Sequence, residues 1–157
     1  MKARFVLILL SICMICGYAA AFGETLYPVR GPLAAQAPPP VITAKFSGTN
    51  SGKFTLSQPG GESFQGKWTF VVPSFVNTRT PQDPGAYLPQ PNLAFAWDAI
   101  YGPGYFLATI VGTRVRQVVA KGDRGTVIQV ECLFSDPHAG YNGVAVDSKG
   151  NVYKVVW

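Results

Sequence analysis

Cys132, Asp136 and His138 are the residues whose types and spacing come closest to a nucleophilic catalytic site. In such a site the thiol attacks, the imidazole takes its proton, and the carboxylate orients the imidazole. All three fall within seven positions at the end of an expected strand, where side chains rarely converge in this way. In a strand, Cys132 would also lie on the same face as the apolar residues Val130 and Phe134, a pattern that predicts a small buried side chain instead.

The sequence gives little indication of a metal site or of a catalytic carboxyl group. His138 is the single histidine of the chain, and with Asp136 it would supply two metal ligands with no third nearby. Asp98 is the one carboxyl group in an aromatic setting, and its position favours an exposed helical residue over a general acid. The sequence therefore predicts no metal site and no cofactor. An envelope hydrolase using Cys132 and His138, or Asp98, is the alternative function.

The densest group of basic residues is the candidate ligand-binding site, and it comprises Arg114, Arg116, Lys121 and Arg124. Arg114 and Arg116 are two positions apart, so in a strand both would point to the same face. Such a patch could contact anionic lipid headgroups or cell-wall polymer. Charges on the solvent face of a hairpin also serve solubility alone, and this second interpretation stays open.

The first residues of the chain carry the pattern of a cleavable bacterial signal peptide. Lys2 and Arg4 precede an uncharged apolar run over residues 5–16, and small residues follow at the positions that a signal peptidase reads. We expect cleavage after Ala21 or Gly23 and export to the periplasm or outer envelope of a bacterium. The apolar run is short for an uncleaved membrane anchor, which needs about 20 residues.

Removal of the leader also limits the partners. Two of the formal +5 charges belong to it, which leaves +3 on the mature chain. A charge this small and this dispersed argues against a nucleic-acid partner. Two of the three cysteines lie in the leader as well, so the mature chain has no disulfide framework.

The sequence divides into a signal peptide (1–23), a proline-rich lead-in (24–40) and a β-rich globular domain (41–157). In the lead-in, Pro28 and Pro32 restrict the backbone to extended conformations, as does the proline run that ends the segment. We expect this stretch to form a spacer or a surface arm and to contribute nothing to the core.

Beyond residue 40 the apolar residues alternate with a period of two, which is typical of β-strands. A proline-rich loop is expected over 73–92, and a short helix over 92–101, although this last segment also alternates as a strand would. The fold class that follows is mainly β: a small antiparallel barrel or sandwich of about eight strands, whose last strand pairs with its first. The expected strands are 41–46, 53–57, 62–72, 105–113, 115–120, 126–134, 143–147 and 152–157.

Several strings in the chain resemble a family of uncharacterised bacterial exported proteins, many of which look like lipoproteins. They are LYPVRGPL at 26–33, AWD at 96–98 with YGPG at 101–104, and GDRGT at 122–126. Similar proteins carry a lipobox cysteine just before the first string, where this chain has Gly23 and Glu24. The resemblance implies an envelope location and brings no known activity.

The function expected from the sequence is a non-enzymatic binding or interaction module of the cell envelope. Its partner would be an envelope ligand or another protein, with a peripheral contact to a membrane surface as one form of that interaction.

Overall fold

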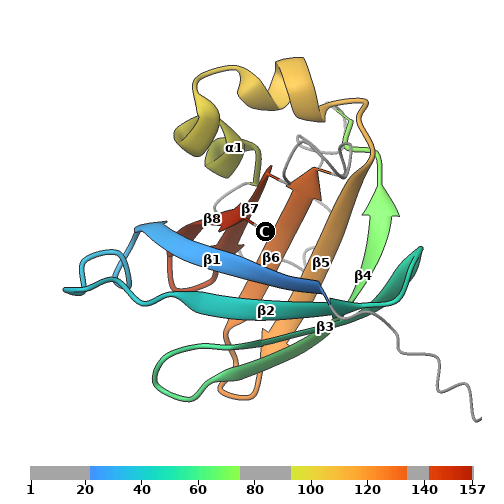
Figure 1. The fold of residues 1–157 in the computed structure, drawn as a ribbon. Helices are drawn as coiled ribbons and strands as arrows, with labels where there is room; N and C mark the ends of the chain where they lie inside the picture. Colours follow the sequence, from blue (N-terminus) through green and yellow to red (C-terminus); the bar gives the residue numbers. More distant parts are fainter. Residues whose placement is uncertain (1–21, 75–92, 134–141, 157) are drawn as a thin grey trace, which may run out of the picture.

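A closed antiparallel β-barrel forms the body of the molecule, as the sequence predicted (Figure 1). The computed structural model describes residues 22–74, 93–133 and 142–156. Each strand pairs with the next along the chain, and β8 pairs with β1 to close the barrel. The strands are β1 (Phe22–Arg30), β2 (Ile42–Ser47), β3 (Ser51–Ser57), β4 (Ser63–Val71), β5 (Val115–Gly122), β6 (Val127–Leu133), β7 (Asn142–Asp147) and β8 (Val152–Val156).

Alternate residues of the strands fill the barrel interior with large apolar side chains. Phe64 and Trp68 on β4 are both buried, with Gly66 between them on the same face. A Cβ atom on Gly66 would lie 2.8 Å from the Cβ of Ala120 on β5, closer than carbon atoms can pack. The absence of a side chain at Gly66 therefore allows β4 and β5 to pack closely here.

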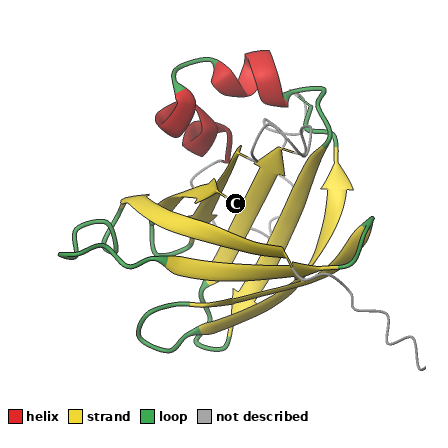
Figure 2. Ribbon diagram, in the orientation of Figure 1, coloured by secondary structure: helices red, strands yellow, loops and turns green. Residues whose placement is uncertain are grey.

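A helical layer covers one side of the barrel from outside (Figure 2). It consists of α1 (Leu93–Tyr101) and the single-turn π-helix η1 (Phe106–Ile110). Trp97, Phe106 and Ile110 pack against Val144 and Val146, so β7 is buried on both faces. The helix predicted at 92–101 is confirmed by α1.

The strand predicted over 105–113 is wrong, because this segment is helical. The carboxylate of Asp98 on α1 accepts a hydrogen bond from the backbone N–H of Phe106 at 2.8 Å, which fixes the start of the turn. Phe106 and Ile110 are four residues apart and therefore share a helical face toward the core. Residues four positions apart would also share one face of a strand, so this spacing did not distinguish the two structures.

The expectation that residues 24–40 stay outside the core is also wrong for their first part. Residues 24–30 belong to β1, and Leu26 is fully buried in the barrel interior. Pro28, which has no N–H to donate, is tolerated because the pairing of β1 with β2 ends at Leu26. The barrel therefore closes through β1, and not through the strand predicted at 41–46.

Candidate anion-binding surface

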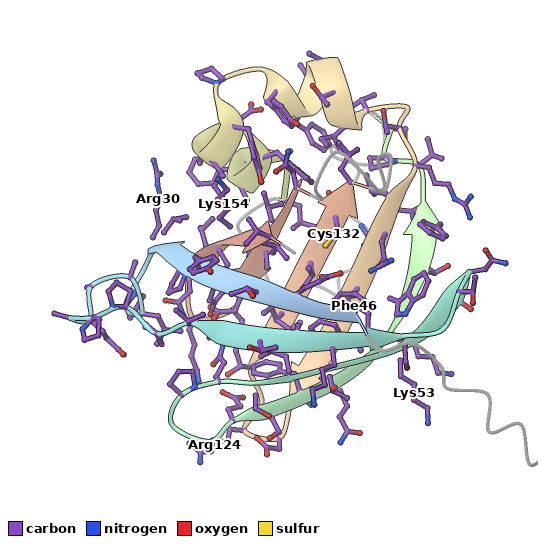
Figure 3. All side chains as sticks on the ribbon, viewed as in Figure 1. Arg30, Phe46, Lys53, Arg124, Cys132 and Lys154 are labelled. Atoms are coloured by element: carbon purple, nitrogen blue, oxygen red, sulfur yellow. The ribbon has the colours of Figure 1, made fainter. Side chains whose placement is uncertain are left out.

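A cluster of polar side chains lies inside the barrel. The guanidinium Nη1 of Arg116 donates to Glu24 Oε1 at 2.9 Å, and the thiol of Cys132 donates to Glu24 Oε2 at 3.4 Å. The rings of Trp68 and Phe46 lie 4.6 and 5.0 Å from the Arg116 guanidinium carbon, close enough for cation–π attraction. Figure 3 shows Cys132 and Phe46 within the barrel. These contacts tie β1, β2, β4, β5 and β6 together from the inside.

The interior strongly changes the acidity of this cluster. Burial raises the pKa of Glu24 to about 8, although the neighbouring Arg116 guanidinium opposes the effect. Burial and the adjacent Glu24 carboxyl group raise the pKa of the Cys132 thiol well above its usual value. Because the thiolate is the nucleophilic form, Cys132 is poorly suited to attack a substrate. Its predicted burial is confirmed, with 2% of its surface exposed.

The residues of the alternative hydrolase are not brought together where the structure describes them. Asp98 lies in the helical layer outside the barrel, whereas Cys132 faces the interior. Asp136 and His138 lie outside the described residues.

The basic residues predicted as a ligand-binding patch are dispersed. Arg116 is 7% exposed and points into the barrel, so the prediction that it shares a surface with Arg114 is wrong. Arg114 is exposed just before β5, and its guanidinium carbon lies 3.8 Å from the centre of the Phe70 ring. Arg124 is exposed in the turn at the opposite end of β5, and Lys121 is exposed on the outer wall.

Lys121 belongs to a different basic feature, which runs across four neighbouring strands. We name Lys45, Lys53, Lys67 and Lys121 the lysine stripe; all four are exposed on the outer wall of β2 to β5. Lys53 and Lys67 stand directly opposite each other, which places their Cβ atoms about 5 Å apart. Lys45 is the diagonal neighbour of Lys53, and Lys121 is that of Lys67, each at roughly 7–8 Å.

Among the residues that the structure describes, the outward-facing positions of β2 to β5 carry no acidic side chain. Six of the eight acidic residues fall in the described part of the chain, and four of these six are buried: Glu24, Glu62, Glu131 and Asp147. Within that part Asp123 is the one exposed acid, against eight exposed basic residues. Across residues 22–74, 93–133 and 142–156, no lysine of the stripe forms an ion pair.

Each buried acid is held by hydrogen bonds in the fold. Asp147 accepts from the hydroxyl of Tyr153 at 2.6 Å and from the backbone N–H of Asn151 at 3.0 Å. Glu131 accepts from the indole N–H of Trp97 at 2.9 Å. Glu62 accepts from Thr126 and pairs with Lys149, whose ammonium lies 2.7 Å away. These carboxyl groups stabilise the barrel and its helical layer, so the net charge of +3 understates how basic the outer surface is.

Comparison with protein-family models, with curated proteins and with solved structures finds no match to this chain. Within the described ranges, no cluster of three histidine, cysteine or acidic side chains could hold a metal ion. No helix in those ranges is long and apolar enough to cross a membrane.

Proposed function

We propose that this protein is an exported, non-enzymatic binding module of the bacterial cell envelope, and that the lysine stripe holds anionic groups of its partner. The observation that carries the proposal is a row of four exposed lysines, with no acidic residue among the described outward-facing positions of β2 to β5. The exposed Asp123 lies beyond this wall, in the turn that follows β5. Like charges directly opposite each other destabilise a sheet, as Lys53 and Lys67 do here. An anionic partner bound between the lysines would offset that repulsion, so binding would also stabilise the folded barrel.

The wall around the stripe suits polar contact. Most of its other outward positions carry threonine, serine or glutamine, including Thr43, Thr55 and Gln65, and these hydroxyl and amide groups can hydrogen-bond to phosphate or carboxylate oxygens. The exposed Val119, opposite Lys67, is the apolar exception among the described exposed positions of this wall. Lysine ammonium groups on flexible stems adapt to ligands of variable spacing better than a rigid guanidinium does. The stripe thus fits a repeating anionic polymer better than one small ligand of fixed shape.

Export is supported by the predicted leader. All residues of β1 as described, Phe22–Arg30, lie beyond the first predicted cleavage site. Cleavage after Ala21 would deliver a chain that contains every strand of the barrel.

The test uses the mature chain from Phe22 and immobilised linear polyphosphate as the anionic probe. We expect binding that weakens steeply as salt rises, because exposed charges are screened within about 8 Å at physiological ionic strength. The double variant Lys53→Gln/Lys67→Gln should lose roughly tenfold or more in affinity. The matched control, Arg114→Gln/Arg124→Gln, removes the same charge from outside the stripe and should lose much less.

Two results would contradict the proposal. Equal losses in both double variants would mean that net charge alone attracts the probe, with no site at the stripe. No binding by the parent protein at low salt would remove the proposed function altogether.

A further inference from the structure

A second surface lies on the seam where the barrel closes, between β1, β8 and α1. Three large apolar side chains are exposed there: Tyr27 at 42%, Val29 at 44% and Phe95 at 50%. Single exposed apolar side chains are common on proteins, but a group of them indicates a contact surface. Whether these three form one group depends on the residues between them.

Two basic residues connect them. Lys154 on β8 stands opposite Tyr27 on β1, and its ammonium lies 5.7 Å from the centre of the Tyr101 ring on α1. The guanidinium of Arg30, which follows Val29, lies 5.5 Å from the centre of the Phe95 ring. Both cations therefore bridge the outer face of the seam to α1, and Figure 3 shows Arg30 and Lys154 between β1 and α1. We name this group the seam patch: Tyr27, Val29, Arg30, Phe95, Tyr101 and Lys154.

The seam patch combines exposed apolar side chains with two cations, whereas the lysine stripe is defined by its four lysines. The two surfaces therefore suit different partners. A polymer of charged groups gains little from exposed Val29 and Phe95, since such a ligand stays hydrated. The interface of a lipid bilayer accepts aromatic and aliphatic side chains at the depth of the headgroups, while basic side chains extend their cations to anionic phosphates. Arg30 and Lys154 supply those cations. Among the described residues the one exposed acid, Asp123, lies in the β5–β6 turn and therefore outside the seam patch.

A second copy of this chain fits the seam patch less well. A two-fold interface brings the same patch from both subunits together, so Arg30 and Lys154 would face the same cations of the other copy. No exposed carboxylate in the described part of the patch would compensate them.

We propose that the seam patch is a peripheral binding surface for anionic phospholipid, with Phe95, Tyr27 and Val29 entering the interface and with Arg30 and Lys154 on the headgroups. The site is distinct from the lysine stripe, and it rests on the proposed function only in that export brings the protein to a membrane. The two surfaces give the module two different contacts, one with an anionic polymer and one with lipid.

The experiment measures cosedimentation of the mature chain with two kinds of vesicle: phosphatidylcholine alone, and equal parts of phosphatidylcholine and phosphatidylglycerol. We expect partitioning onto the anionic vesicles only. The variant Val29→Ser/Phe95→Ser should lose roughly tenfold, and Arg30→Gln/Lys154→Gln should lose a similar factor, because each basic residue near an anionic surface contributes severalfold to binding.

The control is Leu107→Ser/Val119→Ser, which removes two apolar side chains of similar exposure, 55% and 46%, from outside the patch. It should partition as the parent does, and all variants should keep the parent's circular dichroism. Polyphosphate binding by Val29→Ser/Phe95→Ser should stay unchanged, since that variant leaves the lysine stripe intact.

Three outcomes would overturn the inference. The parent protein could bind polyphosphate but neither vesicle, which leaves the proposed function standing and removes the membrane surface. Lys53→Gln/Lys67→Gln could abolish vesicle binding while Val29→Ser/Phe95→Ser has no effect, which assigns lipid to the stripe. A concentration-dependent dimer that Val29→Ser/Phe95→Ser dissolves would make the seam patch an interface between copies.

Discussion

The buried Glu24 carboxyl group predicts an unusual dependence of stability on pH. Glu24 is fully buried, and it accepts hydrogen bonds from Arg116 and Cys132. Burial raises its pKa from 4.5 to about 8, and the attraction of the guanidinium offsets this only in part. The informative change is Glu24→Gln, which keeps the shape of the side chain and stays uncharged at every pH.

The sign of the effect follows from the proton that folded Glu24 retains. Between pH 4.5 and about 8 the folded protein keeps this proton, whereas the unfolded chain has released it. The unfolded state then binds fewer protons, so the free energy of unfolding falls as the pH rises, by up to about 1.4 kcal/mol per pH unit. The contribution of Glu24 is fully present below pH 4.5 and is lost as the pH passes the folded value. Glutamine mimics the protonated form, so the variant escapes this loss.

The assay is urea unfolding of both proteins across about pH 5 to 9, followed by the fluorescence of buried Trp68 and Trp97. We expect similar stability near pH 5, and a variant that is more stable than the parent by on the order of 3 kcal/mol near pH 9. Subtracting the two free energies removes the contributions of other groups, including Glu131, whose pKa burial also raises.

The opposite result near pH 9 would refute this reasoning. A loss of about 3 kcal/mol or more in Glu24→Gln would mean that the ionised pair stabilises the barrel, because the variant would leave Arg116 buried without its counter-ion. A difference that stays constant with pH would show that Glu24 does not titrate in this interval.

Three further predictions concern the interior and the start of the barrel. Cys132 should resist a maleimide reagent in native buffer and react after denaturation, since burial hides the thiol and raises its pKa; rapid native labelling would contradict its burial. Intact mass of the protein from the envelope fraction should show Phe22 as the first residue, because cleavage before Glu24 would place a new ammonium group on a buried residue. Gly66→Ala should lower the free energy of unfolding by about 1–3 kcal/mol in chemical denaturation, with partial recovery on adding Ala120→Gly; an unchanged midpoint would show that β4 and β5 can separate.

The fold class could be predicted from the sequence because most strands alternate cleanly. In β2 the apolar residues Ile42, Ala44 and Phe46 are buried and the residues between them are not, as a half-buried strand requires. The expected number of strands matched although two assignments were wrong. Residues 22–30 form a strand, but Pro28 within it argued against one. Residues 106–110 form a helical turn, although alternating apolar residues predicted a strand over 105–113.

The surface was harder to predict than the fold. Alternation alone places Lys45, Lys53 and Lys67 on an outer face, but only the pairing register shows that they are neighbours. In β5 the apolar residues occupy both parities, because Val115 packs under the helical layer while its neighbours fill the barrel. Arg116 therefore gave no signal of pointing inward.

Nothing local in the sequence indicates that Glu24 and Arg116 meet, since 92 positions separate them. Their pairing depends on β1 closing the barrel, and the proline-rich composition of the lead-in hid that strand. The same closure brings Lys154 opposite Tyr27 and so assembles the seam patch. The Glu24–Arg116 contact and the seam patch thus both depend on β1, the strand that the proline-rich composition did not indicate.

The Glu24–Arg116 pair also explains why a costly interior group is retained, because it fixes the register of β1. A slip of one residue would turn Glu24 to the outer face and Tyr27 into the barrel, since side chains alternate along a strand. Arg116 would then lose its hydrogen bond to the Glu24 carboxyl group, and a hydrogen bond to a charged group contributes about 1.5–3 kcal/mol. An apolar pair would pack at least as well but would not distinguish the two registers so sharply. The register of β1 in turn sets the position of Tyr27 against Lys154, so a buried polar contact inside the barrel determines the surface that we propose binds lipid.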